Sequence, residues 1–453
     1  MSYELFGYFL VIAGTLAFGY GLASSPRNPF PVRLVLLAVV LRIVGSLARF
    51  DMIRLFYGGV ADAQRYFVAG KEIAERIRAF DPVVFSYPFW FGGAGRWWGT
   101  DFTEKLTGLV VGLVGPTMRG AYLCFSMMAF AGLYLVALAV YRHRPGPGAV
   151  RFATWIWLWP SLWFWPSSIG KEAVSLLAIG LVVYGYAGRK GIRWFPFAAG
   201  LGLAFALRPH VAAVLGLATL AAYWLQSWRR LSLRRFVELA AAMVLSLLLL
   251  TSMAAQFGLD ADLEGVQEFV SYRSGQTMEG GSALGGAPAG LAAIPMAFVN
   301  IWMRPFPWDV HNLMALFSAL EVLGLWAVVW WRRRTVAFVF RRWRHDRLLA
   351  FALPFLAGYT LMIGLTFANL GIIARQRSPL FPFVFMVVTA AGAGLVIEQR
   401  QRRAARRRRL APPVVGPRVP AAAGAGGRAV RARRTAPVTR AGGPRPEGEP
   451  SGG

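Results

Sequence analysis

The chain has 453 residues, of which 56% are hydrophobic and only 15% are charged. Its 49 basic residues outnumber 21 acidic ones, which gives a formal net charge of +28. So apolar a composition argues against a soluble globular protein and predicts a polytopic membrane protein, whose basic excess lies in short loops and in the C-terminal tail. Nucleic-acid binding is therefore not expected. The single cysteine, Cys124, excludes disulfides within the chain and argues against a thiolate metal site.

Apolar stretches long enough to cross the hydrocarbon as helices recur along the chain. We expect an all-α fold with about eleven transmembrane helices. The first is expected to be retained, because it begins at Tyr3 without a basic region before it and ends without a clear cleavage site. The predicted spans lie near residues 3–23, 33–56, 118–141, 150–166, 171–187, 194–207, 211–226, 236–254, 309–331, 347–367 and 379–397.

Connections rich in Arg and Lys alternate along the chain with connections that contain few of them, and this alternation predicts the orientation of the chain in the membrane. Lysine and arginine beside spans are retained in the cytoplasm, so we expect an external N-terminus and a cytoplasmic C-terminus. The cytoplasmic connections are then 26–33, 142–147, 188–193, 229–235, 332–347 and the tail, and the external ones are 57–117, 167–172, 207–211, 255–308 and 368–378.

Two domains follow from this reading, a transmembrane domain over residues 1–397 and a tail over 398–453. The tail begins QRRAARRRRL and continues in Pro, Gly, Ala and Arg without apolar periodicity, which predicts disorder. Its simplest role is a stop-transfer signal followed by a solvated segment. The alternative is that its charge binds anionic lipid headgroups or RNA.

The first external connection, residues 57–117, is expected to form two interfacial helices. Its first part reads YGGVADAQRYFVAGKEIAERIRAF, an amphipathic helical pattern, and its last apolar stretch, 106–114, is too short to span. Between them lies an aromatic, glycine-rich segment with Trp90, Trp97 and Trp98. These tryptophans are candidates for stacking on a sugar, although anchoring at the interface is the commoner role of tryptophan at this depth.

Asp62 lies just before the first amphipathic helix and is followed by Arg65 and Tyr66. One interpretation is a helix N-cap, which accepts backbone N–H groups and complements the helix dipole. A carboxylate at the membrane surface after a glycine-containing turn is also suited to act as a general base, and the two roles are compatible. Asp101 is the reserve candidate for the base.

Lys171 and Glu172 lie at the external edge of a hairpin between two apolar spans, after Pro166. A charge at that depth needs a partner, water or an anion. The pair is interpreted as a local ion pair or a snorkelling lysine, or else as an anion seat that the helix N-terminus and Lys171 form together.

Five basic side chains fall in later external connections, against the cytoplasmic bias. A single one is most simply a snorkelling interfacial residue, but together they favour an anionic ligand, since guanidinium groups pair bidentately with phosphate. A metal ion bound at His210 is not favoured, because the chain has only four histidines and no two of them are spaced as a metal-binding pair. Arg42, inside the second span, is too isolated to assign. The five residues are Arg208, His210, Arg304, Arg375 and Arg377.

These features resemble the GT-C superfamily of polytopic glycosyltransferases, which take a sugar from a polyprenyl-phosphate carrier on the external side of the membrane. Asp62, in A-D-A-Q-R-Y, occupies the place of the acidic residue in the first external loop. The segments P-S-S-I-G-K-E, R-P-H, R-P-F-P-W and R-Q-R-x-x-L-F-P look like those of bacterial members tied to envelope polysaccharide. The chain departs from many members in having Ala63 after Asp62 instead of a second acid, and in its additional N-terminal span.

The resemblance implies a hexosyl- or pentosyltransferase of the bacterial plasma membrane, with Asp62 as base and Tyr66, Trp97 and Trp98 at the sugar or acceptor. It implies that the lipid phosphate is held by a set of basic residues. The expected partners are a polyprenyl-phosphate-linked sugar, a glycan, lipid or protein acceptor, and membrane lipids. The resemblance identifies no definite cofactor and leaves a divalent metal open. The basic set comprises Arg65, Lys171, Arg208, His210, Arg304, Arg375 and Arg377.

Three other functions are compatible with the pattern. A Wzy-like polysaccharide polymerase or a ligase also uses external arginines, against a polyprenyl diphosphate. A transporter of lipid-linked sugar would perform no chemistry and often shows repeated halves and polar residues at mid-membrane. A scaffold for an envelope assembly complex would have no need of Asp62. The loop at 255–308, with Tyr272 and Arg273, is a candidate cover for the acceptor site.

Overall fold

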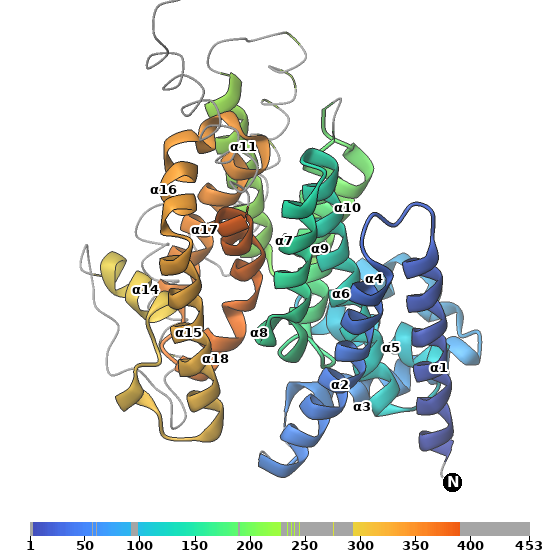
Figure 1. Cartoon of the computed structure of the whole chain (residues 1–453). Helices are drawn as coiled ribbons and strands as arrows, with labels where there is room; N and C mark the ends of the chain where they lie inside the picture. Colours follow the sequence, from blue (N-terminus) through green and yellow to red (C-terminus); the bar gives the residue numbers. More distant parts are fainter. Residues whose placement is uncertain are drawn as a thin grey trace, which may run out of the picture. The chain divides into compact units, whose positions relative to one another are not determined.

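The computed structural model describes residues 3–56, 58–59, 61–91, 98–188, 191–227 and 293–389, together with isolated positions between 228 and 292. Within these residues the chain is helical and contains no strand (Figure 1). The elements up to residue 227 are α1 (Tyr3–Ser24), α2 (Val32–Phe56), α3 (Asp62–Arg78), η1 (Pro82–Phe85), α4 (Tyr87–Phe91), α5 (Thr100–Val114), α6 (Met118–His143), α7 (Pro147–Leu158), α8 (Pro160–Phe164), α9 (Lys171–Tyr186), α10 (Trp194–Leu207) and α11 (Pro209–Ser227). Those that follow are α14 (Ala293–Trp302), η3 (Pro307–Asp309), α15 (Leu313–Trp331), α16 (Arg333–Arg342), η4 (Trp343–His345), α17 (Arg347–Thr366), α18 (Leu370–Gln376) and η5 (Ser378–Leu380).

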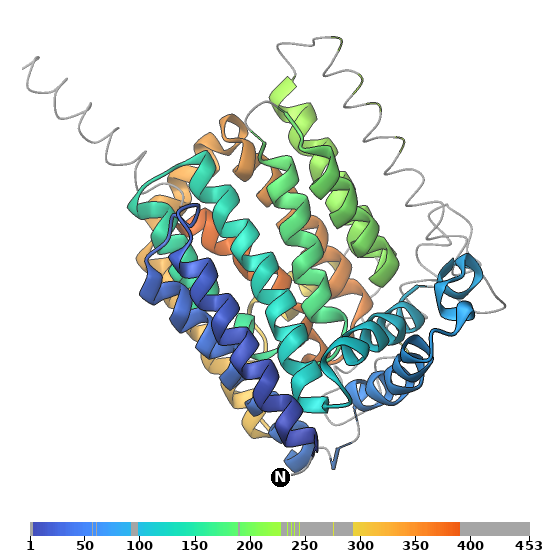
Figure 2. The same ribbon diagram turned by 90° about the vertical axis from the view of Figure 1, so that its right-hand side faces the viewer.

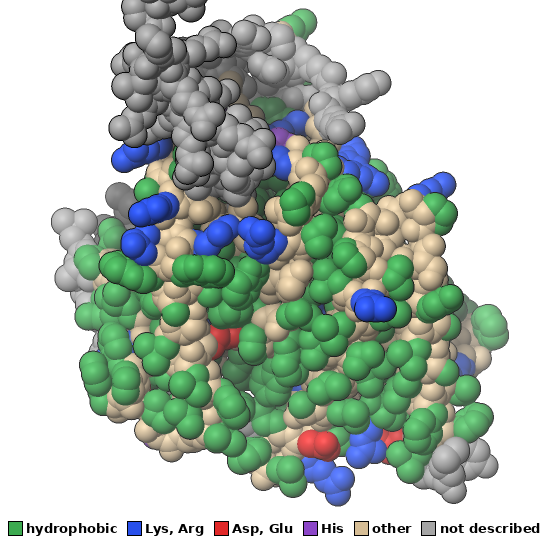
Figure 3. All heavy atoms as spheres, viewed as in Figure 1, with side chains coloured by type: hydrophobic (Ala, Val, Ile, Leu, Met, Phe, Trp, Pro, Cys, Tyr) green, Lys and Arg blue, Asp and Glu red, His purple; other side chains and the backbone are tan. Residues whose placement is uncertain are grey.

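Four helices among the described residues are long and apolar enough to cross a membrane. They are Glu4–Ser24, α6, α15 and α17. Large apolar side chains cover the outside of two of them, such as Phe9 and Phe18 on α1 and Leu320 and Leu323 on α15, each more than half exposed. Figure 3 shows hydrophobic side chains over much of one face. Exposed apolar surface of this extent fits a protein surrounded by lipid, so the chain has the character of a membrane protein.

The predicted count of about eleven spans is not confirmed, because several expected spans are shorter or interrupted. The span expected at 150–166 is divided into α7 and α8, since Trp159 is extended before Pro160. Helices α10 and α11 lie where the spans at 194–207 and 211–226 were expected, with a break at Arg208, but neither is among the four helices long and apolar enough to cross a membrane. The span expected at 236–254 lies outside the described residues, and that at 379–397 is described only to residue 389.

The connection expected at 255–308 contains a helix, α14, that was not predicted. At its Ala297, α14 packs so closely on α17 that a Cβ built at Gly364 would lie 2.6 Å from the Ala297 Cβ. The following span begins at Leu313 and not at residue 309, because Asn312 caps it by accepting the Ala315 N–H at 2.8 Å. Tyr272 and Arg273, the candidate cover, lie outside the described residues.

The first large connection contains the two expected helices, α3 and α5, which pack against each other. A Cβ added at Gly108 would lie 2.5 Å from the Ile73 Cγ2 atom, and one added at Gly70 would lie 2.8 Å from the Thr107 Cγ2 atom. The two glycines therefore permit the close approach of these helices. Figure 2 shows α3 and α5 beside one end of the long helices and at an angle to them.

Three of the connections expected on the cytoplasmic side, 142–147, 188–193 and 332–347, contact one another. Asp346, the N-cap of α17, binds His143 Nε2 at 3.1 Å and forms an ion pair with Arg144. Burial alone raises the pKa of Asp346, but the His143 hydrogen bond and the Arg144 charge outweigh it and leave the pKa below its usual value. Arg347 donates to the Gly188 carbonyl at 2.8 Å. The predicted alternation of connections thus has a structural counterpart at this end, which we call the basic end.

Candidate functional site

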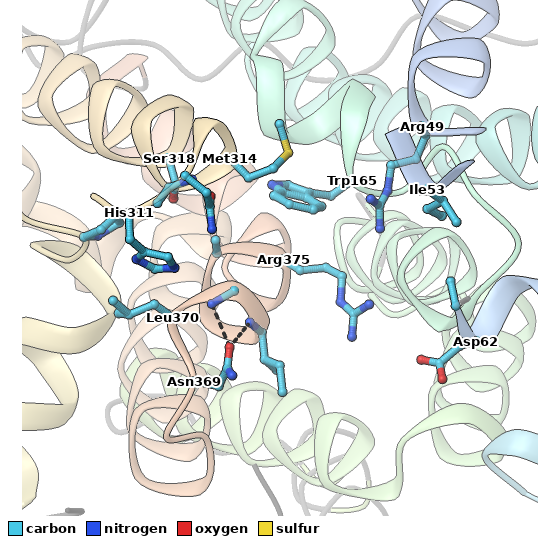
Figure 4. A pocket seen from close by; sticks show the side chains of 17 residues that line it. Arg49, Ile53, Asp62, Trp165, His311, Met314, Ser318, Asn369, Leu370 and Arg375 are labelled. Carbon is cyan, nitrogen blue, oxygen red and sulfur yellow. Dashed lines mark hydrogen bonds between the residues drawn. The ribbon is translucent and has the colours of Figure 1, made fainter. Parts of the chain in front are cut away.

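Two adjoining cavities lie among the connections that were predicted to be external. Cavity A, of about 410 Å³, lies among α3, α5, α9, α10 and α18. Cavity B, of about 440 Å³, lies among α2, α15, α18 and the connection before α15 (Figure 4). The two share six lining residues, so they form one divided space. The shared residues are Arg49, Ile53, Ala61, Asp62, Ile372 and Arg375.

Asp62 is the first residue of α3, and its carboxylate faces the space shared by the two cavities. The N-cap of α3 is Ala61, with no side-chain capping bond, so the N-cap interpretation of Asp62 is wrong. The preceding turn contains Gly58 and Gly59, both with positive φ, and Gly59 N donates to the Ile53 carbonyl at 3.0 Å. This turn brings α3 back toward α2. In Figure 4, Asp62, Arg375 and Arg49 point toward the same space from three elements.

Glu172 organises the basic residues of cavity A. Its Oε1 atom lies 2.9 Å from Arg208 Nη2 and 3.4 Å from Arg375 Nε, and Gln376 Nε2 donates to it at 3.3 Å. Arg208 also donates to Gln376 Oε1 at 2.8 Å. The carboxylate therefore pairs with arginines from two distant segments of the chain.

Lys171 reaches the first residue of α5. Its Nζ atom lies 3.2 Å from Thr100 Oγ1. The start of α5 is fixed to the end of α10, because the backbone N–H of its N-cap residue Gly99 donates to the Ala206 carbonyl at 2.7 Å. Gly99 has a positive φ, a conformation that favours glycine. Trp98 and Thr100 thereby line cavity A together with Lys171 and Asp101.

Tyr66 lies one turn after Asp62 on α3 and is buried against cavity A. Burial, reinforced by the negative charges of Asp62 and Glu172, raises the pKa of Tyr66 to about 12. The phenol therefore keeps its proton near neutral pH and serves as a hydrogen-bond donor beside the carboxylates.

Arg49 lines both cavities and was not predicted as a site residue. Its guanidinium carbon lies 4.9 Å from the centre of the Trp165 ring. Arg42, seven residues earlier, is fully buried and donates to the Leu162 carbonyl of α8 at 2.7 Å. Two arginines seven residues apart lie on the same helix face, and this spacing is the signal that could have identified Arg49.

Three predicted phosphate ligands, Arg65, Arg304 and Arg377, do not line either cavity. Arg65 is largely exposed and pairs with Glu104 at 3.1 Å. Arg377 is buried and donates to the carbonyls of Ile301 and Arg304 and to Ser318 Oγ, at 2.9–3.1 Å. The expectation that Arg375 and Arg377 act together fails because residues two apart on a helix point in nearly opposite directions.

The remaining predicted residues are divided between the site and its surroundings. His210 lines cavity A. Arg304 lies 3.5 Å from Asp309, and this contact helps to shape the connection that brings Pro305 and His311 to cavity B. Trp90 donates to the Val84 carbonyl at 2.9 Å and is not among the lining residues, whereas Trp97 lies outside the described residues.

The described part of the chain contains no group of three or more His, Cys, Asp or Glu side chains arranged to hold a metal ion. The charged side chains that line the two cavities are four cations, Arg49, Lys171, Arg208 and Arg375, and three carboxylates, Asp62, Asp101 and Glu172. Such an arrangement suits an anion that binds the cations beside Asp62, which forms no ion pair with any described residue.

Comparisons with models of known families, with curated proteins and with solved structures found no match for this chain.

Proposed function

We propose that the chain is a membrane glycosyltransferase that moves a sugar from a polyprenyl-phosphate carrier to an acceptor hydroxyl on the extracytoplasmic face. The observation that carries the proposal is the position of Asp62, whose carboxylate faces a space with Arg49 and Arg375 on its other walls. A base and an anion-binding group on opposite sides of one space are what a displacement at a sugar phosphate requires.

The proposed reaction is a single displacement. The acceptor hydroxyl oxygen attacks the anomeric carbon while the bond from that carbon to the phosphate oxygen breaks. The hydroxyl proton passes to Asp62, and the bonding pair leaves with the phosphate, whose added charge is stabilised by Arg375 and Arg49. One displacement inverts the configuration at the anomeric carbon.

The lining of the cavities favours cavity B for the lipid end of the donor. Its apolar lining includes Trp165, Met314 and Leu370, and it lies at the beginning of α15, a candidate span with an exposed apolar face. A polyprenyl chain in the bilayer reaches a cavity beside such a helix without crossing a polar region. Cavity A, with more polar lining side chains, is assigned to the acceptor and the transferred sugar.

Glu172 restricts which arginines bind the phosphate. Arg208 is already satisfied by Glu172 and Gln376, so its role is to hold α9, α10 and α18 together. Arg375 is 30% exposed at its side chain and makes the longer contact with Glu172, which leaves it better placed to pair with an incoming phosphate. We therefore assign the phosphate to Arg375 and Arg49.

The transporter alternative has less support in the described residues. Arg42 and Glu321, charged residues within long helices, both bind the backbone of α8, at Leu162 and Ser161, and line neither cavity. A polymerase or ligase that uses a polyprenyl diphosphate remains the nearest alternative, because the same basic groups would accept its phosphates.

The test of this proposal uses purified protein in lipid with a panel of polyprenyl-phosphate and polyprenyl-diphosphate sugars. Release of polyprenyl phosphate that depends on an added acceptor supports the glycosyltransferase. Turnover confined to diphosphate donors carrying oligosaccharides would transfer the assignment to a polymerase or ligase. Movement of the lipid between leaflets with every glycosidic bond intact would support the transporter.

A further inference from the structure

α16 presents a group of cations at the basic end that the proposed reaction does not use. Its sequence, RRTVAFVFRR, has arginines at both ends and lies between the candidate spans α15 and α17. One face packs on the bundle, since Thr335 and Val339, four residues apart, are buried. The helix is thus attached by its apolar face and leaves its arginines outside.

Aromatic side chains accompany these arginines at the surface. Trp330 and Trp331, at the end of α15, are 70% and 71% exposed, and Phe340 on α16 is 58% exposed. We call Trp330, Trp331, Arg333, Arg334, Phe340 and Arg341 the α16 surface; all six side chains are exposed. Figure 3 shows Lys and Arg side chains on the part of the molecule where Figure 1 places α16.

The arginines of the α16 surface pair with no carboxylate among the described residues, unlike others at the basic end. Arg333 lies over the Trp330 ring, 4.9 Å from its centre, and donates to the Trp330 carbonyl at 3.2 Å. Arg144, in contrast, pairs with Asp346, and Arg347 donates to Gly188. The charge of the α16 surface is therefore available to an anionic partner outside the described chain.

We propose that the α16 surface binds the headgroups of anionic phospholipids. The surface continues the exposed apolar row of α15, which includes Leu320, Leu323 and Trp326, so its aromatic side chains begin where the lipid-facing row ends. Tryptophan is favoured at the boundary between hydrocarbon and headgroups, and guanidinium groups pair with phosphate oxygens. An acidic protein partner would explain the arginines but not their continuity with a lipid-facing helix.

Native mass spectrometry of the delipidated full-length protein tests this proposal by counting bound lipids during titration. The probes are dioleoylphosphatidylglycerol, dioleoylphosphatidylcholine and, as a competitor, inorganic phosphate. The test variant is the triple substitution Arg333→Gln, Arg334→Gln and Arg341→Gln. The matched control is Arg54→Gln, Lys71→Gln and Arg76→Gln, which removes three exposed cations from α2 and α3. Thermal unfolding of both variants checks that they are folded.

We expect the wild type to bind phosphatidylglycerol more tightly than phosphatidylcholine and the control to retain this preference. The test variant should lose affinity for phosphatidylglycerol by about fivefold for each arginine removed, as follows from about 1 kcal/mol for each basic residue near an anionic surface. Equal loss in both variants, or an unchanged preference in a folded test variant, would overturn the proposal. Full displacement of the lipid by inorganic phosphate would replace it with a free-anion site.

Discussion

Glu172 is the residue on which the geometry of cavity A depends most. Its carboxylate is 12% exposed and lies within 3.4 Å of Arg208 and Arg375, which come from segments about 170 residues apart in the chain. A buried carboxylate between two guanidinium groups avoids an unpaired charge in a region of low dielectric constant. It also fixes the direction of Arg375, the arginine assigned to the phosphate.

Replacement of Glu172 by glutamine should therefore destabilise the protein. The change leaves two partly buried arginines without their counter-charge, and breaking a buried ion pair on one side costs about 3–5 kcal/mol. Thermal unfolding in detergent should show a clear fall in the midpoint, whereas Glu75→Gln, an exposed acid on α3, should leave it unchanged. Partial recovery is expected when Arg208→Gln is added to Glu172→Gln, and additive losses in the double variant would argue against the coupling.

Helices α3 and α5 together position one side of the candidate site. Asp62 and Tyr66 come from α3, and Thr100 and Asp101 come from α5. The two helices approach closely because glycines face side chains of the other helix at Gly70 and Gly108. The separation of α3 from α5 thus determines the width of cavity A on one side.

Gly108→Ala should widen this helix pair, because the new Cβ would lie 2.5 Å and 2.7 Å from the Cγ2 and Cβ atoms of Ile73. A Cβ close to the stem of a side chain cannot be relieved by a rotamer change alone, and overpacking typically costs about 1–3 kcal/mol. Gly112→Ala is the control, since its Cβ meets Ile77 only at 3.9 Å. We expect a lower unfolding midpoint for Gly108→Ala alone; equal midpoints for the two variants would contradict this packing.

Two sets of connections can be distinguished among the described residues, and the proposed function places them on opposite sides of the membrane. One set surrounds the cavities, and the other joins Asp346 to His143 and Arg144 at the basic end. Positively charged connections are retained in the cytoplasm, so the cavities should face the exterior.

Cysteine labelling in intact cells tests this orientation. In a Cys124→Ala background, a cysteine at Glu72 on α3 should react with a membrane-impermeant maleimide added outside, and a cysteine at Arg344 should react only after permeabilisation. Both positions are exposed. The reverse pattern of labelling would place the cavities in the cytoplasm and remove the basis for a donor presented on the outer face.

The sequence predicted the membrane character and the helical fold, and it singled out most of the charged residues that line cavity A, because hydrophobic length and charge distribution are local properties of the chain. It did not predict α14 or the division of the span at 150–166, which depend on tertiary packing and on the backbone at Trp159. Pairing at the site depends on contacts between distant segments. The local sequence around Glu172 could not identify Arg208 and Arg375 as its partners, because the three-dimensional arrangement brings them there from distant segments.

The role of Asp62 is the central claim, and the most direct measurement is the release of polyprenyl phosphate by protein in lipid, with Asp62→Asn compared with wild type. Asp51→Asn, an exposed acid on α2 that lines neither cavity, is the matched control. The loss of a general base should slow acceptor-dependent release by about 100-fold or more while donor binding and folding stay intact. Release at the wild-type rate by folded Asp62→Asn would contradict the account.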